Sequence, residues 1–497
     1  MAVPEEIRRV ERPKNTIVVD RGGNGPRRFA VVKRIGCRRV GTRNVPVNGP
    51  TVGHIIAGRY VPKPAVDPET GQLPRTPVSR READVLSWAA PKVALEAGDG
   101  LLDELLAVFD AGDALNLFAV ACLRVARPGV CDGRLKGAYE RSWLRVALPG
   151  AQLSKNKVSQ LVEATGRARS PVAEFMRGRA ARVAEDHHVI VDGTLVQDDP
   201  GASDLSRFSR KARVKGTRDI SVLYALDVET GEPVCGKAYP GNVVDSVSYA
   251  DFLSECGIRA GIIVGDKAFA HKAAEGVFGA CPELHWLNPL KRNDKRIAES
   301  KMYEWEGILE GLDRDVKYKK VDLGEDGFLY SFYDRGRAVK EERDWFRRQK
   351  GKEDRFDAEK AREVDERFGT VVFESDLDMD PLTVWMGYEE RWQVELVFDY
   401  YKQALDLDDT RVQSADSVVG SEFVNFIATT ITTRIIKRFD EAGLLRKYSY
   451  GAIMEDLRTL EIVRVDEGGE WMFSRTTKRA RELADRLGLE PPAKVAA

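Results

Sequence analysis

The spacing of apolar residues divides the chain into a helical part and a part with strands. Between residues 81 and 185, apolar positions recur every three to four residues, as in 101–109 and 114–123. This period is typical of amphipathic helices. From residue 187 onward the pattern changes to short apolar runs separated by turn residues, which is typical of buried strands. We therefore predict a helical domain that is followed by an α/β domain.

Five apolar runs after residue 187 predict strands, at 187–192, 220–227, 234–240, 261–266 and 283–287. The first and the fourth run each end in an aspartate. Residues 228–233 form a turn, so the second and third strands are expected to form a hairpin. Helices are expected at 246–256 and 267–278. Strands alternating with helices in this order predict an α/β fold with a mixed sheet.

The pattern changes twice more toward the C-terminus. Residues 290–385 interrupt the α/β pattern with charged stretches that flank short strands, expected at 316–321, 327–333 and 370–373. A helix is then expected from about Pro381, and an amphipathic partner helix at 422–436. Residues 441–497 are expected to be helical.

The first 80 residues are basic and rich in Gly and Pro, with short β-branched runs that predict strands and loops. They contain 16 Lys and Arg against 6 Asp and Glu, although the whole chain has a net charge of −1. Clustered positive charge is typical of proteins that bind a polyanion. We therefore predict that this segment contacts DNA, with a solvated tail as the alternative. The densest basic positions are Arg27, Arg28, Lys33, Arg34, Arg38, Arg39 and Arg43.

The composition argues against several classes of protein. No run approaches the roughly 20 apolar residues of a membrane span. The first residues lack the apolar core of a signal peptide, so we expect a cytoplasmic, nucleoid-associated protein. The six cysteines are scattered and form no C-x2-C pair, and the five histidines have no metal-ligand spacing with them. A zinc site or a disulfide framework is therefore not expected.

Tyr388, Arg391, Glu395 and Lys402 follow the spacing Y-x2-R-x3-E-x6-K. At about 100° per residue these four side chains fall within an arc of roughly 60° on an α-helix. From composition, about 0.06 matches of this charge pattern are expected by chance. The alternative is a surface helix with an Arg391–Glu395 ion pair, worth about 0.2–0.5 kcal/mol. We interpret the pattern as a functional helix face.

Asp192 and Asp266 each follow an apolar run, and the carboxyl ends of strands in α/β sheets are where sites form. An aspartate there is also a common turn former or helix cap. The conjunction with Glu395 favours a site, because three converging carboxylates repel one another unless a cation neutralises them. Hard oxygen ligands favour two Mg²⁺ ions, with Mn²⁺ as a substitute. Such a pair could activate a water or a 3′-hydroxyl for attack on a phosphodiester.

Cations near these acids suggest how a DNA backbone would be held. Arg391 and Lys402 suit phosphate contacts, and Tyr388 could bond a phosphate or stack on a base. Residues 207–218 carry six basic residues and no acid, which predicts a DNA-facing loop rather than a merely solvated one. Within this loop the predicted DNA-binding residues are Arg210, Lys211, Arg213 and Lys215.

Over residues 187–437 the chain resembles the DDE transposases of bacterial insertion sequences, in the branch defined by the Y-x2-R-x3-E-x6-K pattern. Asp192-Gly-Thr resembles the first catalytic aspartate of that family. Tyr239 to Ser246 is similar to its Pro-Gly-Asn…Asp-Ser segment. Asp266-Lys-Ala-Phe is similar to the second aspartate with its following small and aromatic residues, and all four positions of the last pattern match.

The resemblance implies an RNase H-like core, two Mg²⁺ ions and a catalytic triad of Asp192, Asp266 and Glu395. It further implies terminal inverted repeats and target DNA as substrates, cut-and-paste transposition by hydrolysis and strand transfer, and a homodimer that bridges two DNA ends. We expect a basic DNA-binding segment at 1–80 and a helical DNA-binding or dimerisation domain at 81–185. The two parts of the core are expected at 186–289 and 386–440, with a mostly β insertion domain between them at 290–385. A C-terminal helical region is expected at 441–497.

Two other functions remain open from the sequence. An RNase H-like nuclease that cuts branched or hybrid nucleic acid would share the three acids, but it would not need the Tyr388, Arg391 and Lys402 positions or a basic N-terminal segment. A repurposed transposase that only binds DNA would be expected to have lost an acid, and all three are present.

Overall fold

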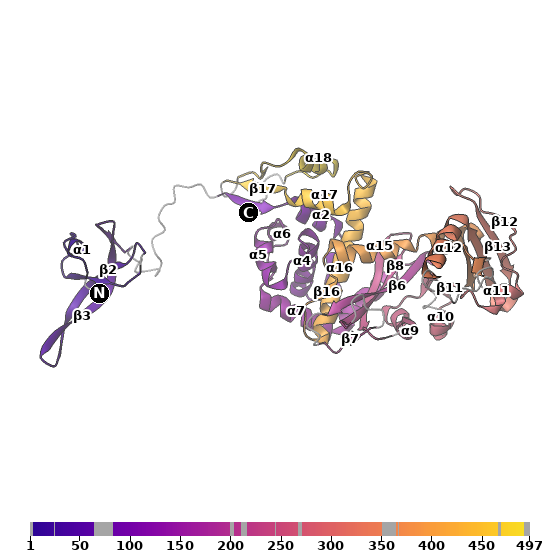
Figure 1. The fold of residues 1–497 in the computed structure, drawn as a ribbon, viewed down its shortest axis with the longest axis horizontal. Coiled ribbons are helices and arrows are strands. Elements are labelled where there is room, and N and C mark those ends of the chain that lie inside the picture. Colours follow the sequence, from indigo (N-terminus) through magenta and orange to yellow (C-terminus); the bar gives the residue numbers. More distant parts are fainter. Residues whose placement is uncertain are drawn as a thin grey trace. The chain divides into compact units, whose positions relative to one another are not determined.

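A computed structural model of the chain describes residues 3–23, 25–63, 83–198, 203–209, 216–243, 245–266, 271–349, 364–365, 367–465 and 469–491. The chain divides into two compact units, residues 1–82 and residues 83–497 (Figure 1). Each unit is described by itself.

The first unit is a four-stranded antiparallel sheet in the order β1-β2-β3-β4, preceded by the short helix α1 (Glu5–Arg8). Its strands are β1 (Thr16–Asp20), β2 (Phe29–Val40), β3 (Arg43–Ile56) and β4 (Arg59–Pro62). A small core forms around Ala30, Val31 and Ile55, which are almost fully buried. The sequence predicted β1 and the first residues of β2, but it did not predict that β2 and β3 form a long hairpin.

The second unit is built on an eleven-stranded mixed sheet, which confirms the predicted α/β class. Strand β10 pairs in parallel with β6 on one side and with β11 on the other, whereas β8 pairs antiparallel with β6 and β9. The central strands are β6 (His188–Asp198), β8 (Arg218–Asp227), β9 (Glu232–Pro240), β10 (Ala260–Val264) and β11 (Glu283–Pro289), with the short strands β7 (Arg207–Phe208) and β16 (Asp409–Thr410) at one end.

Residues 290–385 extend this sheet instead of forming a sheet of their own. Their last strand pairs antiparallel with β11 through Leu287↔Ser375 and its neighbours. The strands are β12 (Gly307–Ile308), β13 (Val316–Asp322), β14 (Phe328–Asp334) and β15 (Thr370–Ser375). The helices and 3₁₀ turns around them are α9 (Asp245–Cys256), η2 (His271–Ala274), α10 (Glu275–Ala280), α11 (Lys295–Glu299), η3 (Gly324–Asp326) and α12 (Arg335–Gln349).

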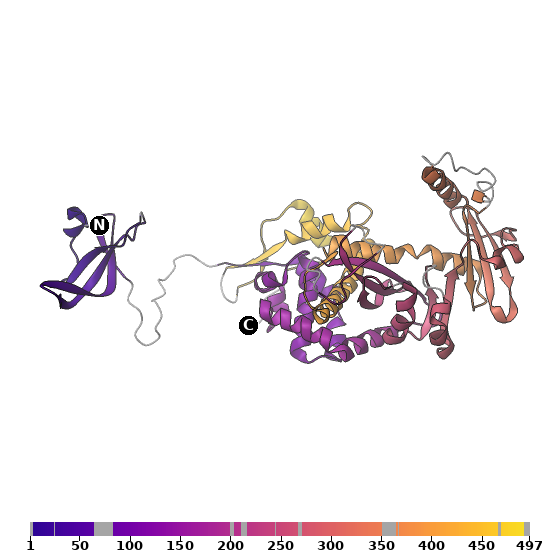
Figure 2. The same ribbon diagram turned by 60° about the horizontal axis from the view of Figure 1, so that its bottom comes forward.

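The helical region before the sheet packs on the long helix α16 (Ala415–Glu441), most of whose residues are buried. Both views show α16 between these helices and the sheet (Figures 1 and 2). The helices are α2 (Ala89–Ala97), α3 (Leu101–Leu106), α4 (Ala111–Ala126), η1 (Asp132–Arg134), α5 (Leu135–Glu140), α6 (Leu144–Ala147), α7 (Lys155–Arg167) and α8 (Arg169–Ala180). Among the described residues, no helix has both the length and the apolar character needed to cross a membrane.

A very close approach in this packing lies between α7 and α16. A Cβ added to Gly166 would lie 1.8 Å from the carbonyl oxygen of Asp416, and one added to Gly420 would lie 1.8 Å from that of Val162. Only residues without a side chain allow the two helix backbones to come this close.

The C-terminal region is not purely helical, in contrast to the prediction from its sequence. It contains α17 (Tyr450–Arg458), β17 (Glu461–Arg464), β18 (Met472–Phe473) and α18 (Lys478–Arg486). Strand β17 pairs with β5 (Asp84–Ser87), so a strand from the start of the unit completes a three-stranded sheet near its end. The edge-to-face pair of Trp88 and Phe473, with centroids 5.2 Å apart, packs in the same place. Local patterns cannot show such pairing, because it joins segments about 370 residues apart.

Candidate active site

Asp192 lies in β6, and Asp266 follows the neighbouring strand β10 by two residues. Val264 pairs with Ile190 in the parallel ladder of β10 and β6. Continuing this register by two residues puts Asp266 level with Asp192, and neighbouring strands are about 4.8 Å apart. The prediction that both aspartates end a strand is wrong for Asp192, which lies inside β6 and pairs with Tyr224 of β8.

The carboxyl group of Asp192 is held in a place that disfavours its charge. Burial raises its pKa, and the negative charges of Asp266 and Glu395 raise it further. A hydrogen bond of 2.8 Å from the Gly193 amide and the positive charge of Arg391 oppose this rise. Asp192 is therefore close enough to Asp266, Glu395 and Arg391 for each of their charges to act on it.

Glu395 and Arg391 reach this space from the helical segment that packs on β6. Glu395 is exposed in α15 (Trp392–Asp399). Arg391, directly before α15, lies 3.8 Å from Asp266 between Nη2 and Oδ2, and its Nε is buried without a hydrogen-bond partner among the described residues. A distance of 3.8 Å is an ion pair and not a hydrogen bond. The guanidinium therefore contributes charge to the site while retaining unused donor capacity.

The four patterned residues do not share one straight helix, so that prediction is corrected. Tyr388 lies in α14 (Pro381–Glu389), Glu395 in α15, and Lys402 in the π-helical segment η5 (Tyr400–Ala404). A turn at Glu390 and Arg391 separates α14 from α15. Because a π segment has more residues per turn than an α-helix, the constant 100° step fails there.

Tyr388 and Lys402 are each engaged by the protein itself. The Tyr388 hydroxyl accepts a hydrogen bond of 3.1 Å from Arg337, and its ring packs edge-on against Phe373 at 4.6 Å. The positive charge of Lys402 acts on Asp219, which pairs with Gln197 five residues along β6 from Asp192. Five residues of a strand span about 17 Å. Lys402 thus belongs to a more distant part of the same surface.

One exposed aromatic residue near the acids, Trp392, was not predicted from the sequence as part of the site. Trp392 directly follows Arg391 and is 55% exposed. An indole exposed next to a charged site can stack on a nucleic-acid base. The position of Trp392 between Arg391 and Glu395 could have pointed to it in the sequence, because a helix face that meets polar partners does not normally carry a Trp.

The predicted basic loop lies mostly outside the described residues. Arg210, Lys211, Arg213 and Lys215 all fall in 210–215. Of the flanking residues, Arg218 lies over the ring of Phe208 at 5.1 Å, and Phe208 is 62% exposed.

The donor set suits a hard divalent cation. Three carboxylates supply oxygen ligands only, and burial with the nearby charges of Asp266 and Glu395 raises the pKa of Asp192, so a bound cation would stabilise its carboxylate form. The oxygens of the three acids are not all close enough together to share one metal ion. Among the described residues, the three side chains whose ligand atoms all lie within 4.8 Å of one another are a different group. Binding a cation would therefore draw the three side chains closer together.

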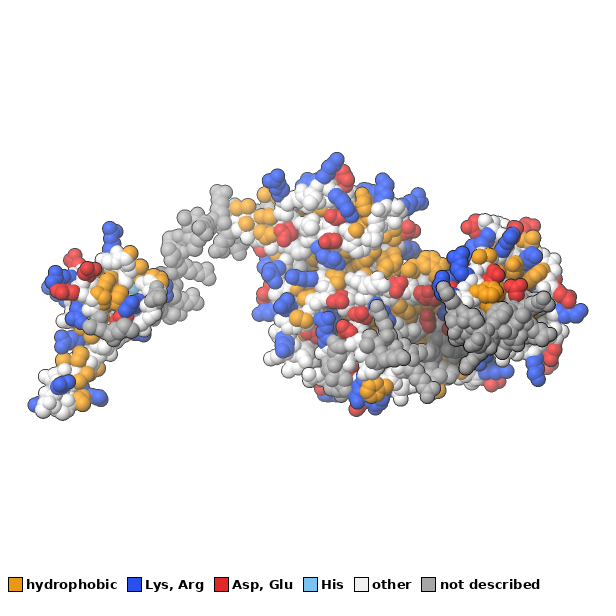
Figure 3. Space-filling view, viewed as in Figure 1, with side chains coloured by type: hydrophobic (Ala, Val, Ile, Leu, Met, Phe, Trp, Pro, Cys, Tyr) orange, Lys and Arg blue, Asp and Glu red, His pale blue; other side chains and the backbone are white. Residues whose placement is uncertain are grey.

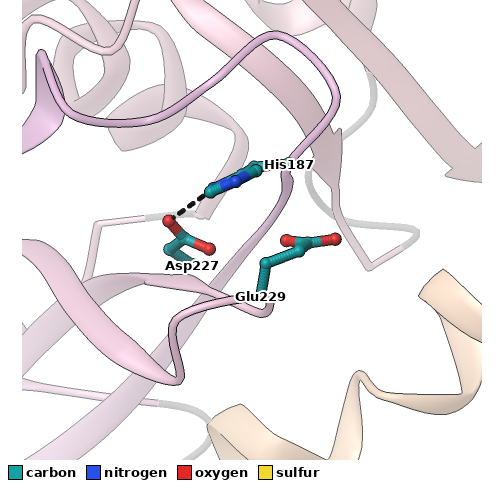
Figure 4. A group of neighbouring side chains, drawn as sticks. All are labelled: His187, Asp227 and Glu229. Carbon is teal, nitrogen blue, oxygen red and sulfur yellow. Dashed lines mark hydrogen bonds and ion pairs between the residues drawn. The ribbon is translucent and has the colours of Figure 1, made fainter.

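That other group is His187 directly before β6, Asp227 at the end of β8 and Glu229 in the turn that follows (Figure 4). His187 Nδ1 lies 2.9 Å from Asp227, which raises the pKa of His187. Both oxygens of Glu229 are used by His188, through its backbone amide and its Nδ1, each at 2.8 Å. These side chains are therefore used in hydrogen bonds that hold the turn between β8 and β9 against the start of β6, which explains the cluster without a metal ion. It does not contain any of the three predicted acids.

A buried polar network supports the segment that carries Lys402. Tyr401 donates a hydrogen bond of 2.7 Å to Glu422 of α16, and the Asn425 amide donates another of 3.0 Å. Asn425 in turn accepts from Arg124 of α4. Burial raises the pKa of Glu422 to about 7. The network joins α4, α16 and η5, so it fixes the π segment on the core.

Glu422→Gln is expected to remove a pH dependence of stability. The folded pKa lies above that of an unfolded glutamate, so the folded protein binds more protons between about pH 4.5 and 7, and stability falls as pH rises through this window. Gln stays neutral throughout, so at pH 8 the variant should be more stable by about 2–3 kcal/mol. Thermal melts from pH 5 to 8 measure this. If the melting temperatures of the variant and of the unchanged protein changed in parallel with pH, the raised pKa of Glu422 would be contradicted.

Comparison with known proteins gives a family match over close to half of the chain. Residues 184–431 match the family described as transposase DDE domain. A comparison with curated proteins gives no match. Among solved structures, the chain is similar to a piggyBac transposase synaptic complex with hairpin DNA, determined by cryo-EM. The identity is 13% and the TM-score 0.41, with 82% of this chain and 86% of that chain covered.

The family match and the geometry coincide in one segment. Asp192 comes from β6, Asp266 follows β10 and Glu395 comes from α15, and the charges of Asp266 and Glu395 act on Asp192 in the fold. All three positions, and Arg391 with them, fall between residues 184 and 431. The segment 184–431 is therefore a match to the transposase DDE domain family.

Proposed function

We propose that the protein is a metal-dependent DNA transposase that moves a bacterial insertion sequence by a cut-and-paste reaction. The observation that carries this is the placement of Asp192 in β6, of Asp266 two residues after the neighbouring strand β10, and of Arg391, which lies 3.8 Å from Asp266 and directly before the helix that carries Glu395. The match of the surrounding segment to the transposase DDE domain family supports it.

Asp192, Asp266 and Glu395 would hold two Mg²⁺ ions, with Mn²⁺ able to substitute. Bound there, such a pair supplies an activated water or 3′-hydroxyl and charge stabilisation for the leaving oxygen. Asp192 lies within β6 and Asp266 follows β10, which pairs with β6, so the sheet would bring both carboxylates to the same place. Glu395 is exposed on α15 and closes the set from the helical side.

Arg391 and Lys402 would bind phosphates of the DNA at two separate places. The Arg391 guanidinium, which makes an ion pair of 3.8 Å with Asp266, would contact a phosphate near the acids. Lys402, close to Asp219, would contact the backbone further along the duplex. Tyr388 is better explained as a positioning residue, because its hydroxyl is already bonded by Arg337.

The remaining features of the proposal follow from the family rather than from the residues described. They are an RNase H-like core, a homodimer that joins two inverted repeats, target DNA as the acceptor, and location in the cytoplasm at the nucleoid. The basic residues Arg210, Lys211, Arg213 and Lys215 would add DNA contacts next to β7.

The decisive experiment is a cleavage assay on a duplex that carries the sequence flanking the gene. The unchanged protein should nick it at the repeat boundary with Mg²⁺ and not with EDTA. Glu395→Gln should lower the rate on the order of 10³-fold, because it removes a metal ligand that is worth several kcal/mol in the transition state. Glu441→Gln, an exposed change at the end of α16, is the matched control and should leave the rate unchanged.

Full cleavage by Glu395→Gln would rule out the proposed triad. Metal-dependent cleavage of branched DNA or RNA–DNA hybrids, without cleavage at the repeat boundary, would favour the structure-selective nuclease. Binding of the duplex with no cleavage at all would favour a repurposed DNA-binding protein.

A further inference from the structure

The hairpin of β2 and β3 forms an arm that extends beyond the core of the first unit. We define the arm as residues 33–48. Its residues are exposed throughout, whereas Ala30, Val31 and Val32 at its base are buried. Eight residues of a strand span about 25 Å. Figure 1 shows this hairpin projecting from the unit. An arm of this length has no hydrophobic core of its own to hold it in place.

The arm carries positive charge and apolar residues but no acid. From Phe29 to Ile56 there is no Asp or Glu, while the arm holds Lys33, Arg34, Arg38, Arg39 and Arg43. Four of its apolar side chains are unusually exposed: Ile35 at 66%, Val40 at 52%, Val45 at 46% and Val47 at 41%. Figure 3 shows basic and hydrophobic side chains together on this part of the unit.

The register sorts these side chains onto two faces. Arg38 pairs with Val45, Val40 with Arg43, and Gly36 with Val47. Because side chains alternate along a strand and paired residues share a face, these pairs form one face of two arginines and three valines. The opposite face carries Arg39 with Asn44. In the described part of the first unit, neither face is covered by another element.

We propose that this arm is a β-ribbon that enters a groove of duplex DNA. The arginines at its tip would contact the phosphates on the groove walls, and the valines would contact the base edges or sugars inside. A two-stranded ribbon fits the width of the major groove. This inference rests on the proposed function only in the choice of DNA as the polyanion.

Two features disfavour a second copy of the chain as the occupant of the arm. Pro46 in β3 has no backbone N–H, and proline at the edge of a sheet disfavours addition of a further strand. Arg38, Arg39 and Arg43 lie within six positions at the tip, so two arms placed together would bring like charges into contact. A polyanion relieves this repulsion, and an identical arm increases it.

The test measures equilibrium binding of the full chain to a random-sequence duplex of several helical turns, in EDTA, over a range of salt. The variant Arg38→Gln, Arg39→Gln, Arg43→Gln is compared with Arg8→Gln, Lys14→Gln, Arg59→Gln. The second triple change removes the same charge from exposed positions in the same unit but outside the arm. Since all six side chains are exposed, both variants should fold, and thermal melts verify this.

The arm variant should lose about 100-fold in affinity near physiological salt, and the slope of log K against log salt should fall by about 2–3. The control should stay within a few-fold of the unchanged protein. Equal affinities and slopes for the two variants would overturn the proposal, as would a change of oligomeric state in the arm variant without a change in DNA binding. The binding assay in EDTA requires no cleavage, so it can be interpreted even if the protein proves to have no catalytic function. Likewise, the cleavage assay can be interpreted even if the arm proves not to bind DNA.

Discussion

Asp192→Asn is expected to abolish metal-dependent cleavage and, at the same time, to stabilise the protein in the absence of metal. Loss of a ligand that contributes several kcal/mol should lower the cleavage rate on the order of 10³-fold or more. The stabilisation follows from the raised pKa of Asp192, which shows that the folded protein disfavours the charged carboxylate. Cleavage assays with Mg²⁺ and thermal melts in EDTA measure the two effects.

The sign of the stability effect follows from proton linkage. A folded pKa above the unfolded value of 3.8 means that the folded state binds more protons between the two values, so stability falls as pH rises through that window. The asparagine has no such penalty. Its advantage should therefore be present at neutral pH and vanish as pH falls below the unfolded pKa.

Mg²⁺ provides a further readout on the same pair of proteins. The cation should raise the melting temperature of the unchanged protein, because it binds the folded state, and it should do so much less for Asp192→Asn. Asp399→Asn is a suitable control, since it removes an exposed carboxylate from the end of α15. A destabilised Asp192→Asn variant, or one that retains the full Mg²⁺ effect, would contradict the assignment of Asp192 as a ligand.

Gly420→Ala is expected to destabilise the second unit by about 3 kcal/mol or more. Its new methyl group would lie 1.8 Å from the Val162 carbonyl oxygen, far inside contact distance, so α7 and α16 would have to separate. Gly166→Ala should act in the same way, because its methyl group would meet the Asp416 carbonyl oxygen. Thermal or denaturant unfolding of each variant measures the loss.

Gly451→Ala is the matched control for this pair. Gly451 also lies within a helix, α17, but no atom of the described residues lies within 4 Å of the place that its new methyl group would take. Alanine there should be neutral or stabilising by up to about 1 kcal/mol, because it favours the helix. If Gly420→Ala unfolded at the same temperature as Gly451→Ala, the close packing of α7 on α16 would be disproved.

Much of the local structure of the second unit could be predicted from the sequence. The strands at 220–227, 234–240 and 283–287 are present, with ends shifted by only a few residues. Apolar runs of this length are buried on both faces of a sheet, so their pattern is local and strong. The three proposed acids could also be picked out from the sequence. Asp192 and Asp266 follow apolar runs, and Glu395 belongs to the Y-x2-R-x3-E-x6-K pattern, and both features are properties of the sequence itself.

Pairing between distant segments could not be predicted in this way. The sequence did not show that β15 joins residues 290–385 to the core sheet, or that β17 pairs with β5. The break between α14 and α15 and the π segment at Lys402 were also missed, because a regular step of 100° was assumed across them. Tyr401 of that segment donates a hydrogen bond to Glu422 of α16, a contact between distant residues that the local pattern does not contain.

The sequence by itself determined which residues we propose for the chemistry: two aspartates, a glutamate and an arginine in a fixed order along an α/β chain. Only the tertiary structure decided that Asp266 follows the strand that pairs with the strand of Asp192, that Asp192 is buried near the charges of Asp266 and Glu395, and that Tyr388 is bonded by Arg337. The physical reason is the range of the interactions. Side-chain type and period are local properties, whereas burial, strand register and electrostatic coupling depend on which distant segments pack together.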